Sequence, residues 1–334
     1  MSDTSGAVEK PGTRSISVAL EHIEQAVVDL LGETSLLPGQ RLSAMTNVAI
    51  ATAPAGCDLK IVFTGDFVES VKARLDPNSE EAKSYGVERG ASQAIARTLR
   101  RGSNGFDILF SAGILFPAEG QLQEERNLWD QVLTHTAAHE AGHVSLGLNA
   151  NASEAFQDLV KLDETARRFR AAAAVLVEEY RCERLANSQA LVVPTHESSF
   201  DEDISALRLS LNQARPLVGP DVLQALQITM TAAHHYWLTL AYLVAELLPD
   251  GQDSAATPSP LPLGWNAYAA DAWPAISRSL AQLEPANVAM PIQTLTRVTE
   301  ELSVQSLNWL ASIGIDYSFN STEGESCFWR RQAY

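Results

Sequence analysis

The spacing of apolar residues divides the chain into a mixed first part and an almost wholly helical second part. Apolar residues recur at helical spacing through Ile16–Leu31, which predicts a helix that ends at Gly32. Two short apolar runs, Asn47–Ala51 and Leu59–Thr64, lie on either side of Pro54-Ala55-Gly56 and predict a pair of neighbouring strands. Helix and strand signals therefore alternate in this part of the chain.

Further elements of both kinds follow. Asp66 precedes an apolar-periodic stretch and suits the N-cap of a helix. The Asp76–Ser79 cluster predicts a turn, and Tyr85–Arg100 predicts another helix. Asp107–Phe116 is a nearly continuous apolar run closed by Pro117, so it is the clearest strand in the sequence.

Helical spacing dominates after Asn149, and a Pro/Gly/Ser/Asp-rich loop at Asp250–Gly264 interrupts it. The predicted helices cover 153–170, 171–191, 201–214, 219–249, 266–284 and 288–312. We thus expect a disordered N-terminus at 1–14, an α+β part at 15–150, a helical part at 151–313 and an aperiodic, aromatic tail at 314–334.

Candidate chemistry lies where the two parts meet, in His139-Glu140-Ala141-Gly142-His143. Residues four apart share one face of a helix, so His139 and His143 can point two imidazoles at one metal ion. Glu140 lies about 100° around the helix from His139, within reach of a water on that metal. Ala141 and Gly142 are small enough for another backbone to approach closely, and Gly147 and Asn149 are helix stop signals.

The motif resembles the active-site helix of the zincin metallopeptidases. That resemblance implies a zincin-like fold with one Zn²⁺ per chain, His139 and His143 as ligands and Glu140 as general base. The alternative is an ordinary amphipathic helix with paired histidines. A third ligand would decide between these two interpretations.

A candidate third ligand follows on a later predicted helix. The residues of 171–177 are apolar, which predicts a buried helix, and carboxylates that follow a buried face need a partner. Glu179-Tyr180-Arg181-Cys182-Glu183 is similar to the ligand helix of the gluzincin class, which implies Glu179 as ligand and Glu183 as the carboxylate that orients a histidine. A shift of one turn also fits, since Glu183-Arg184-Leu185-Ala186-Asn187 is similar to the E-x-x-A-N motif of repressor-cleaving metallopeptidases.

Other residues are weaker candidates. His135 lies one turn before His139. It could contact a metal ligand without touching the metal itself, or it could be an alternative ligand. Cys182 is a possible ligand or a small buried hydrophobe. By the same resemblance, His235 or Tyr236 would stabilise the oxyanion of the reaction, whereas a satisfied core histidine is the plainer interpretation.

The strand before the motif has two interpretations. In zincins such a strand commonly binds the extended backbone of the substrate, which implies that role for Phe110–Leu115. The other interpretation is a buried central strand.

Composition restricts the partners. The 334 residues suffice for one large or two small domains, and the net charge of −17 argues against nucleic acid or an anionic membrane. Cys57, Cys182 and Cys327 show no paired spacing, so no disulfide framework is predicted. With neither a signal-like start nor an apolar run of membrane-spanning length, we expect a cytoplasmic protein.

These patterns predict a zinc-dependent metallopeptidase that acts on a peptide or protein segment. The alternatives are a non-catalytic binding or scaffold protein with the same fold and a regulatory protease with a single partner protein. An open cleft at His139 would favour the enzyme, and a cleft filled by Asp250–Gly264 or by the tail would favour the scaffold.

Overall fold

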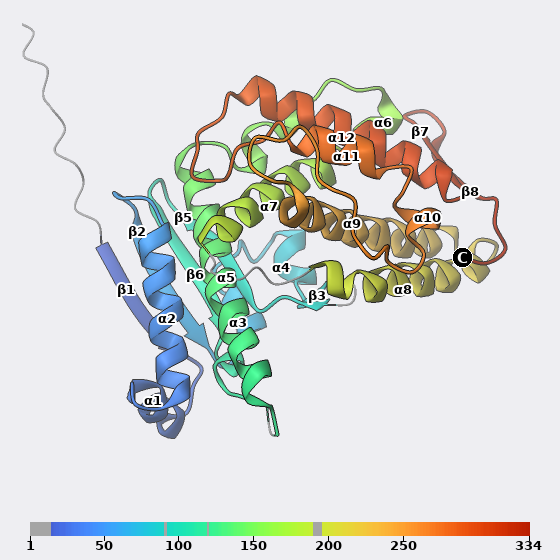
Figure 1. Cartoon of the computed structure of the whole chain (residues 1–334). Helices are drawn as coiled ribbons and strands as arrows, with labels where there is room; N and C mark the ends of the chain where they lie inside the picture. Colours follow the sequence, from blue (N-terminus) through green and yellow to red (C-terminus); the bar gives the residue numbers. More distant parts are fainter. Residues whose placement is uncertain (1–14, 90–91, 119, 190–195) are drawn as a thin grey trace, which may run out of the picture.

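A computed structural model describes residues 15–89, 92–118, 120–189 and 196–334. The protein is mixed α/β, with a small sheet in the first part and a mostly helical C-terminal part, as the sequence predicts (Figure 1). The predicted disordered segment 1–14 lies outside the described residues.

The elements alternate in the first part of the chain and are mainly helical after residue 123. The strands are β1 (Ser15–Glu21), β2 (Asp58–Thr64), β3 (Glu88–Arg89), β4 (Ser92–Gln93), β5 (Ala96–Arg101), β6 (Gly105–Ser111), β7 (Ile315–Asn320) and β8 (Gly324–Trp329). The helices are α1 (Gln25–Gly32), α2 (Leu37–Thr52), α3 (Phe67–Lys72), α4 (Glu80–Ser84), α5 (Gln123–Leu148), α6 (Glu164–Arg167), α7 (Arg170–Gln189), α8 (His196–Ala214), α9 (Val222–Leu247), α10 (Trp265–Tyr268), α11 (Trp273–Leu280) and α12 (Ile292–Ser312). Single 3₁₀ turns lie at 112–115, 153–155, 157–159 and 215–217.

The main sheet has the strand order β1-β2-β6-β5. β1, β2 and β6 are parallel, and β5 pairs with β6 in the antiparallel direction. Helices α2 and α5 cover one face of the sheet, and α3 packs on the other face (Figure 1). Because both faces are covered, most residues of β2 and β6 are buried.

The predicted helix at Ile16–Leu31 is wrong in its first half, which forms β1 before α1 begins. Ile16, Val18 and Leu20 also alternate with period two, so over this short stretch a strand and a helix are equally compatible with the sequence. Parallel pairing of β1 with β2 decides the outcome.

Two other predictions in the first part fail for the same reason, that tertiary packing overrides a short local pattern. Asn47–Ala51 is the last part of α2, whose Met45 and Ala49 are buried against the sheet, so the predicted pairing with Leu59–Thr64 does not form. Tyr85–Arg100 holds β3, β4 and most of β5 instead of a helix. The Leu59–Thr64 strand is confirmed as β2.

The predicted N-cap at Asp66 is confirmed, since its side chain accepts a hydrogen bond from the Glu69 N–H. The strongest strand signal, Asp107–Phe116, is β6 followed by the 3₁₀ turn at 112–115. β6 has β2 on one side and β5 on the other, so it is a buried central strand. Its backbone is therefore used within the sheet, and the predicted substrate-binding role of Phe110–Leu115 is wrong.

The helical second part is confirmed with changed boundaries. The 153–170 segment holds only 3₁₀ turns and α6, and the 266–284 segment splits into α10 and α11. The tail at 314–334 is not aperiodic but contains the antiparallel hairpin β7-β8. Its Ile315 and Trp329 are buried in the helical core, which explains the aromatic composition of the tail.

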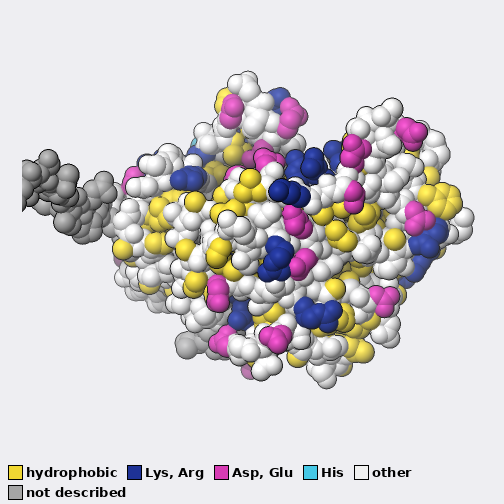
Figure 2. Space-filling view, turned by 90° about the horizontal axis from the view of Figure 1, so that it is seen from above, with side chains coloured by type: hydrophobic (Ala, Val, Ile, Leu, Met, Phe, Trp, Pro, Cys, Tyr) yellow, Lys and Arg dark blue, Asp and Glu magenta, His cyan; other side chains and the backbone are white. Residues whose placement is uncertain are grey.

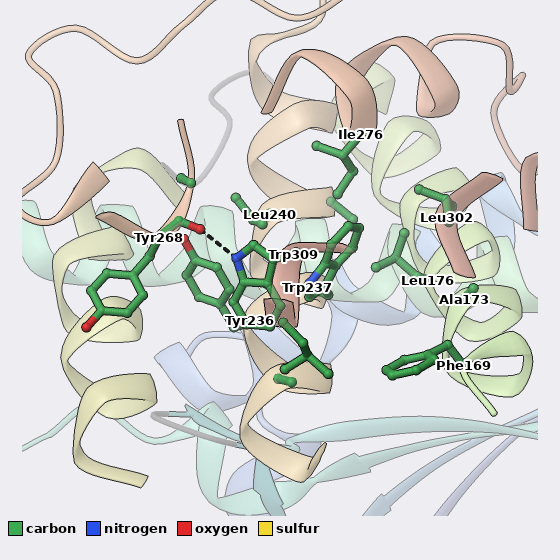
Figure 3. Packing of buried hydrophobic residues seen from close by; sticks show 14 of the residues in the cluster. Phe169, Ala173, Leu176, Tyr236, Trp237, Leu240, Tyr268, Ile276, Leu302 and Trp309 are labelled. Atoms are coloured by element: carbon green, nitrogen blue, oxygen red, sulfur yellow. Dashed lines mark hydrogen bonds between the residues drawn. The ribbon is translucent and has the colours of Figure 1, made fainter. Parts of the chain in front are cut away.

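A single large apolar core joins α7, α8, α9, α11, α12 and the C-terminal hairpin. Trp309 of α12 lies at its centre, with its indole N–H donating to the Tyr268 carbonyl at 2.7 Å (Figure 3). Tyr236 of α9 stacks on Trp309 with ring centroids 5.4 Å apart. This core fixes the position of α9 and α7 relative to one another.

None of the helices in the described part of the chain is long and apolar enough to cross a membrane. On the face shown in Figure 2, Lys and Arg side chains are scattered among Asp and Glu side chains and do not form a continuous basic surface.

Gly147 offers a test of the contact between α5 and the sheet. It does not end the helix, which runs on to Leu148, but lies against Phe106 of β6. A Cβ atom at this position would lie 2.6 Å from the Phe106 ring, so overpacking outweighs the better helix propensity of alanine. We expect Gly147→Ala to lower the free energy of unfolding by about 1–3 kcal/mol in denaturant titrations.

Gly32→Ala is the matched control, because no atom lies within 4 Å of a Cβ atom built at Gly32 in α1. It should be neutral or slightly stabilising. Equal effects of the two substitutions would contradict the packing argument.

Candidate metal centre

Helices α5 and α7 pack side by side and bring the histidine motif against the acidic run. They come close together at Gly142, where a Cβ atom would lie 3.0 Å from Cys182 Sγ and 3.1 Å from Cys182 Cα. Such contacts are tighter than nine in ten of those that real Cβ atoms make, so any side chain at this position would require Cys182 or its backbone to shift, and glycine favours the close approach. The close approach predicted for the small pair Ala141-Gly142 is confirmed.

Both imidazoles turn their Nε2 atoms toward the same carboxylate. His139 Nε2 lies 3.1 Å from Glu179 Oε2, and His143 Nε2 lies 3.6 Å from Glu179 Oε1. Two imidazole nitrogens and one carboxylate that converge in this way are donor atoms that could hold a metal ion.

The opposite ring nitrogens each have their own carboxylate. His139 Nδ1 lies 3.0 Å from Glu183 Oε2, and His143 Nδ1 lies 2.9 Å from Glu178 Oε1. Glu178 is itself held, since its other oxygen accepts the Ser153 N–H at 2.8 Å. Carboxylates on the far nitrogen fix the tautomer and ring orientation of a ligand histidine, which is the role that the sequence assigned to Glu183 and overlooked for Glu178.

Glu183 is the centre of a buried network. Its Oε1 atom lies 2.9 Å from His135 Nε2 and 3.0 Å from His196 Nε2, and its side chain is only 4% exposed. His135 thus contacts an orienting carboxylate rather than Glu179, which places it behind the candidate ligands. His196, the first residue of α8, is a member of the network that sequence reasoning missed.

The geometry separates the alternatives for the third ligand. Glu179 faces both Nε2 atoms, whereas Glu183 faces Nδ1 of His139. In the shifted motif Asn187 would orient a histidine, but among the described residues its side-chain atoms have no hydrogen-bond partner. Cys182 remains a candidate, because donor atoms of His139, His143 and Cys182 all lie within 4.8 Å of one another.

The electrostatics of the centre favour bound cations. Burial by itself lowers the pKa of His139, but hydrogen bonds with Glu179 and Glu183 raise this pKa well above 6.5. Burial raises the pKa of Glu179, yet the charge and hydrogen bonding of the two facing imidazoles bring it below its ordinary range. The negative charge of these carboxylates can be balanced either by protons on the imidazoles or by a metal ion between them. Metal binding would therefore release protons from the imidazoles. Burial also raises the pKa of the Cys182 thiol, which favours its neutral form, so Glu179 is the better candidate for a negatively charged ligand.

Glu140 is positioned by a hydrogen bond from strand β5 of the sheet. Thr98 Oγ1 of β5 lies 2.7 Å from Glu140 Oε2 and 2.9 Å from the Glu140 carbonyl oxygen. Glu140 lines the same cavity as His139, His143 and Glu179. The candidate base thus has a fixed carboxylate beside the converging donor atoms.

Helix α9 places a phenol at the centre. The Tyr242 hydroxyl donates to Glu179 Oε2 at 2.8 Å, and the Tyr242 ring stacks on His196 with centroids 5.2 Å apart. Both predicted α9 residues, His235 and Tyr236, line the cavity, and Tyr236 is 2% exposed because most of its side chain packs in the apolar core (Figure 3). Their proposed role in the reaction stays a prediction, and Tyr242 is the α9 residue in contact with a candidate ligand.

The centre opens into a cavity of about 1250 Å³. One wall is formed by β5 and the chain before it, and the other by α8 and α9. Among the described residues, neither the loop at 250–264 nor the tail at 314–334 lines this cavity. The cleft is therefore not filled by either segment, and residues of edge strand β5 line it.

The residues that sequence reasoning missed come from elements far apart in the chain. Glu178 could have been noticed as part of the acidic run. It directly precedes Glu179, and it lies four residues before Cys182 and therefore on the same face of the helix as that candidate ligand. Tyr242 lies seven residues after His235, two turns along the same helix face. Thr98 and His196 give no local signal, since only the packing of β5 and α8 brings them to the motif.

Comparisons with known protein families, curated proteins and solved structures gave no match to this chain. The interpretation of the centre therefore rests on its own geometry and chemistry.

Metal content tests the assignment of the ligands. We expect about one zinc ion per chain in the purified protein and none after combined His139→Ala and His143→Ala substitution. Glu183→Gln should weaken zinc binding by about 10- to 100-fold, and Glu179→Ala by more, in competition with a chelator.

Cys182→Ser is the matched control on the same helix face, and it should retain zinc if Cys182 serves packing against Gly142. If Cys182→Ser loses zinc while Glu179→Ala retains it fully, Cys182 is the third ligand and Glu179 is not.

Proposed function

We propose that the protein is a zinc-dependent metallopeptidase of the gluzincin type with a zincin-like fold. The observation that carries this proposal is the double convergence on α7, in which Glu179 faces Nε2 of both histidines while Glu183 and Glu178 hold their Nδ1 atoms. A chance pair of histidines on an amphipathic helix has no reason to have an orienting carboxylate for each ring.

The residues present fit a zinc ion held by His139, His143 and Glu179. When bound, zinc polarises a carbonyl and lowers the pKa of a water molecule to about 7. Glu140, steadied by Thr98, would take the proton of the attacking water and pass it to the leaving amine. The Tyr242 hydroxyl would turn from Glu179 to donate to the carbonyl oxygen as negative charge develops on it.

The sheet supports a peptide as substrate. β5 is an edge strand next to the motif helix, and residues 94–100 line the cavity. An extended peptide could add to this edge, so that backbone hydrogen bonds bind it and place a scissile bond beside Glu140. The cavity also exceeds the roughly 300–1,000 Å³ typical of sites for small molecules.

The open cavity and the buried, positioned Glu140 favour an enzyme over a non-catalytic scaffold with the same fold. A regulatory protease with one partner protein would use this same centre, and the choice of substrate distinguishes it from a general peptidase.

Glu140→Gln tests the proposed base. The amide keeps the shape of the side chain but cannot accept the proton, so we expect hydrolysis of a peptide library to fall by about 10²- to 10⁴-fold. Zinc content and the melting temperature should stay unchanged, since Glu140 is not a ligand. A fully active Gln variant would rule out this mechanism.

Tyr242→Phe tests the proposed oxyanion donor. Removal of one such donor elsewhere lowers kcat by about 10²- to 10³-fold, and we expect a loss of this size with little change in KM. His235→Ala and Tyr236→Phe are the comparison variants. If His235→Ala or Tyr236→Phe lowers kcat as strongly and Tyr242→Phe does not, the donor is one of the residues indicated by the sequence.

A further inference from the structure

The cavity continues beyond the metal centre along α8 and α9. His196 begins α8 beside Tyr242 of α9, and the two helices run antiparallel and packed against each other from there. Asp203 lies seven residues further along α8, about 10 Å at the helical rise of 1.5 Å per residue, and it lines the cavity together with Thr239. This places a carboxylate in the wall at some distance from the candidate ligands.

Asp203 has no cationic partner among the residues that the structure describes. It is partly buried, and none of the described Lys, Arg or His side chains brings a nitrogen within 4 Å of its carboxylate. Burial raises its pKa from 3.8 to about 6, and the positive charge of the more distant His196 and a hydrogen bond with the Thr239 side chain oppose this rise only in part. A carboxylate held in a cavity wall without a counter-ion is destabilised, and a ligand cation would relieve that penalty.

The basic residues of the opposite wall are already engaged. Arg74 pairs with Glu21 at 2.7 Å and with Asp107 at 2.8 Å, and Arg97 pairs with Glu81 at 2.7 Å. Arg100 donates to the carbonyl oxygens of residues 102 and 103. An acidic group of a ligand would therefore have to break an existing interaction, whereas a basic group meets a carboxylate that has a hydroxyl neighbour, Thr239, but no ion pair among the described residues.

The charge of the whole cavity points the same way. Seven carboxylate side chains and three guanidinium groups line it among the described residues. A bound divalent metal ion leaves this lining negative, and a negative cleft with low-dielectric walls concentrates cations.

We propose that Asp203 is a specificity-determining residue that binds the side-chain cation of a lysine or arginine in a peptide substrate. A span of about 10 Å corresponds to three residues of extended peptide at ~3.4 Å per residue, so the basic residue lies within three positions of the scissile bond. This inference deepens the proposed function and rests on it, because it assumes that the cavity takes a peptide.

Binding can be measured without turnover in the Glu140→Gln protein loaded with zinc. The probes are fluorescent decapeptide pools in which one position at a time is fixed as lysine or as norleucine, which has nearly the same shape without the charge. We expect at least one position at which the lysine pool binds roughly tenfold more tightly than the norleucine pool in fluorescence anisotropy. Adding Asp203→Asn should reduce that ratio to about one by weakening only the lysine pool.

Glu202→Gln is the matched control, because Glu202 is the exposed neighbour of Asp203 on α8 and does not line the cavity. It should keep the preference for lysine. Asp203→Ala provides a second variant, and the melting temperature of each confirms that it is folded. Equal binding of the two pools, or a preference that survives both substitutions of Asp203, would overturn the inference.

Hydrolysis of the same pools by the unsubstituted protein reports on the proposed function separately. Absence of cleavage with a lysine preference that depends on Asp203 would contradict the peptidase and support the cation site. Cleavage without such a preference would support the peptidase and contradict the role of Asp203.

Discussion

The contact between α5 and α7 at Gly142 determines the rest of the centre. Because Cys182 packs directly against Gly142, where a side chain would make tight contacts, the two helices approach closely enough for carboxylates on α7 to reach both ring nitrogens of His139 and His143. A wider separation would leave Glu178, Glu179 and Glu183 buried without partners, and unpaired buried charges are strongly destabilising. Close packing and charge pairing therefore depend on each other at this position.

Each of the two helices is held from behind by a different layer. α5 packs on the sheet through Ala137, Ala141 and Val144, while α7 packs into the helical core. On α7, the fully buried Arg181 points away from the centre and donates to the carbonyl oxygens of Glu284 and Val288. These contacts fix the rotation of both helices, and a centre whose ligands must be placed within a fraction of an ångström needs such support.

The two ends of the cavity differ in how their carboxylates are satisfied. Near α5 every carboxylate of the network has an imidazole, a hydroxyl or a backbone N–H as partner. Further along α8, Asp203 has the Thr239 side chain as a hydrogen-bond partner but no cation within 4 Å in the described part of the chain, so a basic ligand group would complete its environment. The candidate metal centre and the proposed site for a basic side chain are compatible with one extended substrate bound along edge strand β5.

The sequence by itself determined the helix with His139, Glu140 and His143, the acidic run on a later buried helix and the predominance of helix after residue 150. These features depend on spacing within one helix, which local periodicity encodes. The tertiary structure decided which short apolar segments became strands, since Ile16–Leu20 and Ala96–Arg100 are strands only through pairing with β2 and β6. It also brought Thr98, His196 and Tyr242 to the motif from positions about 40, 55 and 100 residues away, because contacts between distant segments follow from packing and leave no periodic signal in the chain.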